Sequence, residues 1–425
     1  MKSINLFGYC LLVFCFLFTT QVKGQDVNED IPLPEGMTFP MDSLLSDWRV
    51  RTFIVSDEDC NTSKVNPEFP DSVYIDRLSR IPTIMEMTYN EVVRKFIDTY
   101  NVRLRNQVSL MLASSNFYMP IFEEALDAYG LPIELKYLPI IESALNPSAV
   151  SRAGASGLWQ FMIKTGQIYG LSSNSLVDER RDPIKSTWAA ARYLKDLYDI
   201  YKDWNLVIAA YNCGPGNVNK AIRRSGGKTD YWEIYEYLPR ETRGYVPAFI
   251  AANYVMTYYC NHNICPMETN IPADTDTLQI TRKLHFEQIS DLCNISVDQL
   301  ASLNPQYKNH IIPGDSKPYT LRLPHNQICA FISNQDSIYA HRADELFKNR
   351  RTVDVKASQA SSSRRTSSGS ASASGKLVYH KIRNGESLST IATKYGVRVN
   401  DIMSWNNMRN NKIIAGKQLK IYKKK

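Results

Sequence analysis

The sequence predicts a mainly α-helical protein that ends in two copies of a smaller module. Three observations lead to this fold class. Apolar residues recur at helical spacing between residues 92 and 259, apolar positions past Pro272 repeat at one constant offset, and a serine-rich stretch separates the two copies. A chain of 425 residues, of which 44% are hydrophobic, is long enough for two or three globular units.

Residues 1–24 have the pattern of a signal peptide. Lys2 is followed by an apolar run over residues 6–18, and Gly24 is a small residue suited to cleavage after it. The run is too short for a comfortable membrane span. Cys15 lacks the small preceding residues of a lipidated cysteine, so a lipoprotein anchor is the less favoured alternative. We expect an exported protein of the periplasm or cell envelope.

Export also narrows the range of partners. Removal of residues 1–24 takes away Lys2 and Lys23 and no acidic residue, so the formal charge falls from +7 by two, to +5. A mildly basic exported protein suits an anionic envelope polymer, although a solvated basic surface without a target has the same charge. Export argues against nucleic acid as a partner.

Six cysteines follow residue 24, an even number that permits disulfides in an oxidising compartment. Cys260 and Cys265 are the most plausible local pair. Together with His262 they also offer three metal ligands, but no second ligand pair lies nearby. We therefore expect a disulfide or two buried thiols there, and no metal site and no cofactor.

The first region, residues 25–109, is predicted to be an N-terminal extension with helices. Its Pro- and Asp-rich first part shows few periodic runs, and helical spacing begins near Val92. A second helical face over residues 121–129 ends at Gly130, with Pro132 beyond it.

Three further helices are predicted downstream. Asp182-Pro183 opens a long helix that reaches Tyr201, because Asp is a preferred cap and Pro is favoured in the first turn. Asn205 starts a helix that Gly214-Pro215-Gly216 stops, and residues 245–259 form the last helix of this region.

Glu142 is the first candidate for chemistry. It lies among aliphatic neighbours in Leu138-Pro139-Ile140-Ile141-Glu142-Ser143-Ala144-Leu145, one turn beyond a proline suited to starting a helix. Desolvation raises the pKa of a Glu in an apolar pocket, so the group can donate a proton near neutral pH. A leaving glycosidic oxygen needs such a proton. A structural ion pair is the alternative for a lone Glu.

Three more sequence blocks follow in order. They are Ser151-Arg152-Ala153-Gly154-Ala155-Ser156-Gly157-Leu158-Trp159-Gln160-Phe161-Met162, then Ala210-Tyr211-Asn212, then Glu241-Thr242-Arg243-Gly244-Tyr245-Val246. With the Glu142 block, they resemble the family of soluble-lytic-transglycosylase-type murein hydrolases, lysozyme-like enzymes that cleave peptidoglycan glycan strands. The resemblance covers roughly residues 110–260 and implies a lysozyme-like α domain, which we place at 110–268.

Other hydrolytic chemistry finds no support in this region. No histidine occurs before His262, so no Ser-His or Cys-His pair can form within it, and a His-Glu-x-x-His zinc motif is missing from the sequence. Ordinary glycosidases use two carboxylates. Glu142 has no obvious partner, because the nearest acidic residues in sequence, Glu134 and Asp178, lie outside the motif blocks.

The family resemblance implies a mechanism with a single Glu. Glu142 would protonate the glycosidic oxygen and then accept a proton from the 6-hydroxyl of the sugar, while Tyr245 supports the developing charge. Gln160, Tyr211 and Asn212 would line the glycan subsites, with Asn212 facing the acetamido group. Ser151 is a weaker candidate for polar support, and a packing role is the alternative for Tyr211 and Tyr245.

The predicted function is therefore a peptidoglycan lytic transglycosylase, a lyase that cleaves the MurNAc-GlcNAc β-1,4 bond and forms 1,6-anhydro-MurNAc ends. Two alternatives stay open from the sequence. One is a non-catalytic peptidoglycan-binding scaffold, and the other is a muramidase-type hydrolase in which water attacks.

The repeat past Pro272 matches at ten positions, all at one constant offset and without a gap. Phe286, Ile289, Ile295, Val297, Leu300, Leu303, Asn304, Ile311, Ile312 and Gly314 match Leu388, Ile391, Val397, Val399, Ile402, Trp405, Asn406, Ile413, Ile414 and Gly416. The second copy, 377–423, resembles a LysM module of strand, two short helices and strand (βααβ), a family that binds N-acetylglucosamine-containing glycans. The first copy, 276–325, has Lys283 in place of Gly385 and four extra residues before Leu321, so its fold but not its glycan binding is predicted.

Residues 357–375 consist almost entirely of Ser, Ala, Gly, Thr and Arg. Such a stretch cannot bury a core and behaves as a flexible linker, with an end-to-end distance of about 25 Å. The final module is therefore predicted to be a tethered anchor that associates peripherally with the cell wall.

Overall fold

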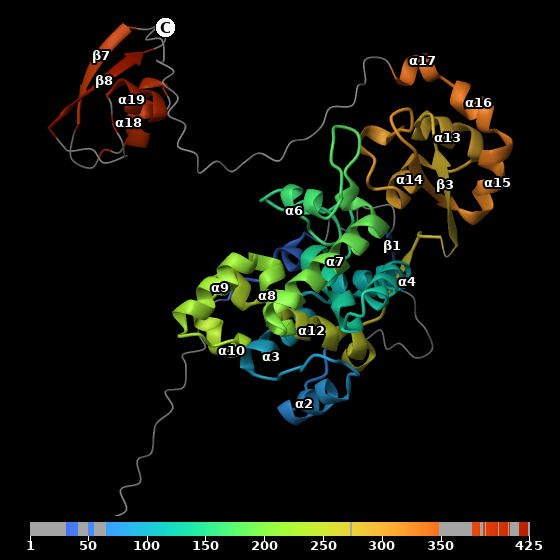
Figure 1. Cartoon of the computed structure of the whole chain (residues 1–425), viewed down its shortest axis with the longest axis horizontal. Coiled ribbons are helices and arrows are strands. Elements are labelled where there is room, and N and C mark those ends of the chain that lie inside the picture. Colours follow the sequence, from blue (N-terminus) through green and yellow to red (C-terminus); the bar gives the residue numbers. More distant parts are fainter. Residues whose placement is uncertain are drawn as a thin grey trace, which may run out of the picture. The chain divides into compact units, whose positions relative to one another are not determined.

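The structure is a computed structural model that describes residues 31–40, 50–54, 65–272, 274–347, 376–382, 386, 388–397, 399–406, 408 and 416–423 (Figure 1). The chain divides into two compact units, residues 1–357 and 358–425. The predicted signal peptide and the predicted linker at 357–375 lie outside the described residues.

Helices dominate the first unit, as predicted. In chain order they are α2 (Asp71–Arg80), α3 (Glu91–Asp98), α4 (Arg105–Ala128), α5 (Leu138–Ser143), α6 (Ile163–Ile168), α7 (Pro183–Tyr201), α8 (Trp204–Cys213), α9 (Pro215–Arg224), α10 (Tyr231–Ile234), α11 (Arg240–Arg243) and α12 (Tyr245–Tyr258), with the short 3-10 helix η1 (Glu35–Thr38) before them. Helix α12 is buried at every position from Tyr245 to Met256 and packs against α3, α5 and α8 (Figure 1). It forms the centre of the helical region.

Local capping signals set the starts of α7 and α8. Asp182 caps α7 by accepting hydrogen bonds from the N–H groups of Ile184 and Lys185, each at 3.0 Å, with Pro183 in the first turn. The predicted start of α7 is confirmed. Helix α8 begins one residue earlier than Asn205, because Asp203 accepts from the N–H of Leu206 at 2.8 Å and acts as its cap.

Helix α4 is longer than its apolar pattern predicts. It runs from Arg105 to Ala128 with Pro120 inside it, whereas periodicity indicated only the part after this proline. Proline lacks an N–H and crowds the preceding turn, which ordinarily ends a helix. Here Tyr118 and Phe122 are both buried on either side of Pro120, so tertiary packing keeps the helix continuous.

The N-terminal extension is part of the same core. Met37 of η1 is 3% exposed within the hydrophobic cluster that extends to Met267. Gln107 Nε2 donates to the carbonyl of Phe39 at 2.7 Å, and strand β1 (Val50–Ile54) pairs antiparallel with β2 (Met267–Thr269). The extension therefore contacts the helical region through both η1 and β1.

The first repeated module follows α12. It contains β3 (Thr275–Ile280), β4 (Lys283–His285), α13 (Phe286–Cys293), α14 (Val297–Leu303), β5 (Ile311–Pro313) and β6 (Tyr319–Pro324), followed by α15 (His325–Ser333), α16 (Gln335–Ala340) and α17 (Ala343–Leu346). Strand β3 pairs with β6 and β4 with β5. Phe331 and Ile338 are buried in the same core, so this core extends beyond residue 325.

The second unit contains β7 (Lys376–Lys381), α18 (Leu388–Tyr395), α19 (Val399–Trp405) and β8 (Gln418–Lys423), and β7 pairs with β8. The predicted order of strand, helix, helix and strand is confirmed. The repeat extends to hydrogen bonds: Asn304 and Asn406 each donate from Nδ2 to two carbonyls and accept one N–H. In each module this asparagine joins the end of the second helix to the last strand.

The predicted Cys260–Cys265 disulfide is wrong. Cys260 is an exposed free thiol in a 3-10 turn, whereas Cys265 is buried and forms a disulfide with a partner outside the described residues. Asn263, between the two, turns the chain with a φ of +53°. Across the described residues no His, Cys, Asp and Glu cluster suits a metal ion, and no helix is long and apolar enough to cross a membrane.

Candidate active site

One cavity of about 530 Å³ brings the predicted site residues together. Its lining includes Glu142, Ser151, Gln160, Tyr211, Asn212 and Tyr245. These side chains come from α5, from the loop after it, from the end of α8 and from the start of α12. The structure thus gathers all six candidates, which the sequence distributes over four separate blocks, around one space.

Glu142 lies at the end of a short buried helix. All residues of α5 apart from Glu142 are buried, and Pro139 occupies the first turn of the helix as predicted. Ser143 fixes the end of the helix, because its hydroxyl donates to the carbonyls of Pro139 at 3.0 Å and Leu158 at 2.9 Å. Ala144, with a φ of +50°, then reverses the chain. The Glu142 side chain is thereby held at the cavity wall.

The surroundings of Glu142 favour its protonated form. The pKa of Glu142 is raised to about 8. Burial is the largest cause, the hydrogen bond from Tyr245 acts in the opposite direction, and the charge of Glu35 adds to the rise. The Tyr245 hydroxyl donates to Oε1 of Glu142 from a side chain that is 2% exposed. Glu142 forms no ion pair with any residue that the structure describes, so it is not the structural ion pair that the sequence left open.

The loop after α5 carries Ser151 and Gln160. Ser151 N–H donates to the carbonyl of Ala155 at 2.9 Å, and its hydroxyl accepts from the N–H of Ala155 at 3.0 Å. Gln160 has a φ of +47°, and its amide donates to the carbonyl of Gly157 at 2.8 Å. Both side chains therefore brace the loop that lines the cavity.

Tyr211 and Asn212 lie at the end of α8. The Tyr211 hydroxyl donates to the carbonyl of Trp159 at 2.8 Å, and burial raises its pKa, so the phenol stays neutral. Asn212 is exposed, and its Oδ1 accepts from the hydroxyl of Thr242 at 2.9 Å. Trp159 itself is fully buried, with its indole N–H donating to Thr187 at 2.9 Å, so it packs in the core and not along the cavity.

Two acidic groups of the cavity were not among the candidates. Glu241, from the fourth motif block, and Glu35, from η1, line the same space as Glu142. The two acidic residues nearest in sequence have other partners: Glu134 accepts the N–H of Met85 at 2.7 Å, and Asp178 pairs with Arg180. No periodicity or motif marks Glu35, and only the folding of the N-terminal extension brings it here.

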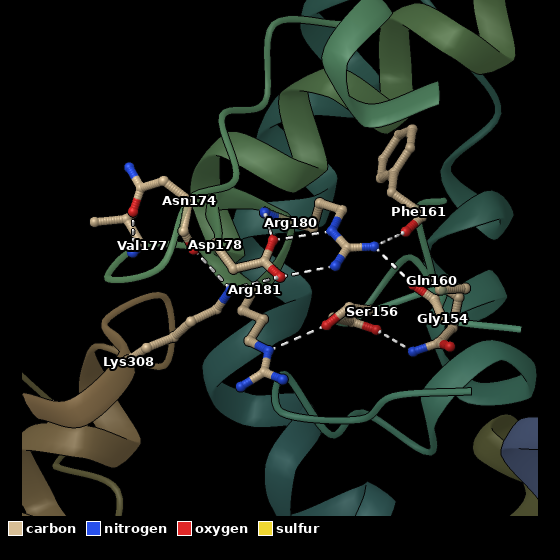
Figure 2. A network of polar contacts seen from close by, with 12 residues as sticks. Gly154, Ser156, Gln160, Phe161, Asn174, Val177, Asp178, Arg180, Arg181 and Lys308 are labelled. Atoms are coloured by element: carbon tan, nitrogen blue, oxygen red, sulfur yellow. Dashed lines mark hydrogen bonds and ion pairs between the residues drawn. The ribbon is translucent and has the colours of Figure 1, made fainter. Parts of the chain in front are cut away.

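A buried polar network around Arg180 and Asp178 contacts the loop that follows α5 (Figure 2). Arg180, 5% exposed, donates to both carboxylate oxygens of Asp178 at 2.9 and 2.8 Å, and to the carbonyls of Gly154 and Phe161 at 2.8 Å each. Burial by itself would raise the pKa of Asp178, but the bonds and charge of Arg180 outweigh it and lower the pKa. The ionised pair thus holds two points of the loop.

The same network reaches the first repeated module. Nζ of Lys308 lies 3.8 Å from Oδ2 of Asp178 and donates a hydrogen bond to the carbonyl of Asn174 at 2.9 Å (Figure 2). Val177 forms a bridge with Tyr307 and is buried in the core of the module. Through this contact the module packs against the segment that supports the cavity loop.

Three family profiles match the chain. Residues 119–234 match the Transglycosylase SLT domain, residues 274–340 match the LysM-like domain of lytic transglycosylase MltD, and residues 380–421 match the LysM domain. The first match contains five of the six candidate residues, since Tyr245 lies beyond it. Residues 31–40 lie outside all three matches.

Lytic murein transglycosylases are similar in sequence to this chain. The chain is 30% identical over 335 residues to membrane-bound lytic murein transglycosylase D of Escherichia coli K12, which covers 76% of this chain and 69% of that protein. It is 33% identical over 124 residues to the soluble lytic murein transglycosylase of the same organism, covering 28% of this chain and 19% of the relative. The crystal structure of the 70 kDa soluble lytic transglycosylase of Escherichia coli aligns with a TM-score of 0.30 at 28% identity, over 35% of this chain and 25% of that one. The chain belongs to the family of lytic murein transglycosylases that membrane-bound lytic murein transglycosylase D represents.

Proposed function

We propose that the protein is a peptidoglycan lytic transglycosylase that cleaves the MurNAc-GlcNAc β-1,4 bond and leaves a 1,6-anhydro-MurNAc end. The observation that carries this proposal is the buried carboxyl group of Glu142, which accepts a hydrogen bond from Tyr245 in a cavity lined by Gln160, Tyr211 and Asn212. Burial raises the pKa of this group to about 8. The family membership supports the same reaction.

The first half of the reaction uses the proton on Glu142. The carboxyl group gives this proton to the glycosidic oxygen, the bond from that oxygen to C1 of MurNAc breaks, and positive charge develops at C1. Glu142 becomes a carboxylate. The Tyr245 hydroxyl already donates to Oε1, and this bond becomes stronger when the oxygen carries charge.

The second half returns the enzyme to its starting state. The Glu142 carboxylate accepts the proton of the 6-hydroxyl, and O6 bonds to C1 and closes the 1,6-anhydro ring. The proton lost in the first half is thereby recovered, no water is consumed, and one carboxyl group serves as acid and then as base. No second carboxylate has to act as nucleophile.

The remaining candidate residues bind the glycan in this proposal. We assign the contact with the acetamido group to Asn212, which is exposed at the cavity, the subsites to Gln160 and Tyr211, and support of the loop near Glu142 to Ser151. The substrate is the GlcNAc- and MurNAc-containing strand of peptidoglycan. The protein acts in the cell envelope, and we propose the periplasm as its compartment.

Mass spectrometry of fragments released from purified sacculi tests the reaction. Wild-type products should weigh one water less than hydrolysis products and lack a reducing end. Glu142→Gln, which keeps the shape of the side chain, should lose activity by about 10⁴-fold or more, at or beyond the upper end for general acid-base catalysis. Glu124→Gln, an exposed position on α4, serves as the control.

The possible results separate the alternatives. Reducing-end products from the wild type would make the protein a muramidase-type hydrolase with the same acid. Binding of sacculi without release of any fragment would indicate a scaffold. Substantial cleavage by Glu142→Gln would remove Glu142 from the role of acid.

A further inference from the structure

The N-terminal extension contributes a wall of the active-site cavity. Pro34 and Glu35 line it together with Glu142, although residues 31–40 lie far upstream of the matched SLT domain at 119–234. The segment is therefore part of the site by position and not by motif.

Close backbone packing fixes this segment against both catalytic elements. A β-carbon on Gly36 would lie 2.5 Å from the carbonyl carbon of Glu142, and one on Gly244, the residue before Tyr245, would lie 2.9 Å from the carbonyl oxygen of Pro32. Contacts this short leave no room for any side chain. The extension thus touches the backbone at Glu142 and next to Tyr245.

Glu35 also bonds to the cavity loop. Its Oε1 accepts the N–H of Arg152 at 2.9 Å, across a separation of 117 residues in sequence. This bond fixes the peptide that follows Ser151. Glu35 is half-buried, and among described residues this N–H is the only hydrogen-bond donor to its carboxylate.

The charge of Glu35 acts on Glu142. The titratable side chains that line the cavity with Glu142 are Tyr193 from α7, Tyr211 and Cys213 from α8, Glu241 from α11, Tyr245 from α12 and Glu35 from η1. Burial raises the pKa of the three phenols, so they stay neutral, and Glu35 is the acidic group whose charge raises the pKa of Glu142. A like charge disfavours ionisation, and Glu142 keeps its proton to higher pH as a result.

We propose that Glu35 is a positioning residue of the transglycosylase reaction, which holds the Ser151 loop against η1 and places a second carboxylate at the cavity of Glu142. The inference rests on the proposed function, because Glu35 acts through Glu142 as the acid. It assigns the N-terminal extension a part in the active site that the family domain alone lacks.

Two substitutions separate the charge of Glu35 from its hydrogen bond. Glu35→Gln keeps an acceptor for the N–H of Arg152 and removes the charge, whereas Glu35→Ala removes both. Because the lost charge favoured the protonated acid, the alkaline limb of kcat should move to lower pH in both variants. At pH 9 kcat should fall about threefold or more, with no change at pH 6. Only Glu35→Ala should also raise KM and speed hydrogen exchange at the Arg152 amide.

Glu124→Gln is the matched control, because it removes the same charge from an exposed position on α4 that does not line the cavity. Its pH profile should equal that of the wild type. A direct titration of Glu142 completes the test: the ¹³C-carboxyl resonance that disappears in Glu142→Gln should titrate at lower pH in Glu35→Gln.

The outcomes distinguish the two proposals. An unshifted Glu142 titration in Glu35→Gln, or an Arg152 amide that exchanges at the wild-type rate in Glu35→Ala, would overturn the role of Glu35. A wild-type protein that releases no anhydro fragments would instead overturn the proposed function, while the carboxyl titration would still report on Glu35.

Discussion

At the scale of single residues, two glutamates eight positions apart show how surroundings select a role. Glu134 is buried and accepts the backbone N–H of Met85, so its carboxylate serves the fold. Glu142 faces the cavity, where its hydrogen-bond donor is the neutral phenol of Tyr245. Burial raises the pKa of Glu142 to about 8, which suits the role of acid that we propose for it.

Tyr245→Phe should move the pH profile in the direction opposite to Glu35→Gln. The Tyr245 hydrogen bond lowers the pKa of Glu142, so its removal raises that pKa and shifts the alkaline limb of kcat to higher pH. The variant should also lose about tenfold in kcat at neutral pH, less than Glu142→Gln, because the acid itself remains. Rates of fragment release from pH 5 to 10 measure both effects.

Tyr237→Phe is the control for this prediction, since Tyr237 is 44% exposed and does not line the cavity. An alkaline limb that stays in place in Tyr245→Phe would show that the hydroxyl does not set the protonation of Glu142.

At the scale of elements, the cavity loop depends on parts of the chain that are distant from it in sequence. Glu35 of η1 accepts a hydrogen bond from it, and Arg180 donates to the carbonyls of Gly154 and Phe161 (Figure 2). Gly157 packs so closely on the backbone of Arg180 that a β-carbon would lie 2.7 Å from its carbonyl carbon. The loop is therefore held by tertiary contacts and not by its own secondary structure.

Arg180→Met should destabilise the helical region strongly. It leaves the carboxylate of Asp178, which is 2% exposed, without its main partner, and removal of one member of a buried ion pair costs about 3 to 5 kcal/mol. Arg80→Met removes the exposed pair with Asp76 and should cost about 0 to 1 kcal/mol. Thermal unfolding followed by circular dichroism compares the two.

The activity of Arg180→Met should also fall at temperatures where the variant remains folded, because the loop loses two of its hydrogen bonds. Equal melting temperatures for Arg180→Met and Arg80→Met would contradict the role assigned to the buried pair.

At the scale of the whole molecule, the two repeated modules have different surroundings. The first packs on the segment around Val177, within the same compact unit as the cavity. The second forms a compact unit of its own, residues 358–425, with a core that includes Ile391, Ile402 and Ile421. This separation supports an anchoring role for the second module.

Deletion of residues 358–425 should weaken binding to sacculi and leave the chemical step unchanged. A linked module raises the effective concentration of the catalytic unit at its substrate, and short soluble glycans do not need this help. Pull-down on sacculi and turnover of short glycans measure the two properties separately.

Asn406→Leu provides a second test of the same prediction, without a change in chain length. It removes the bonds that join the end of α19 to β8, so it should reproduce the binding loss. An equal loss of short-glycan turnover in either variant would place the module within the active site.

The sequence by itself determined the features whose cause is local. Asp182-Pro183 starts α7 because a cap and a fixed φ act within one turn, and the ten-position repeat appears as two modules that share the Asn304 and Asn406 bonds. Five of the six candidate residues lie within the matched SLT domain, and all six lie around one cavity.

Tertiary structure alone decided the features whose partners are distant in sequence. Glu35 reaches the cavity because η1 packs on α5. Cys265 forms its disulfide with a partner other than Cys260, whose thiol is free and exposed. Helix α4 continues through Pro120 because its flanking aromatics are buried. Periodicity and capping report on neighbours within a few residues, whereas these contacts depend on which surfaces the folded chain brings together.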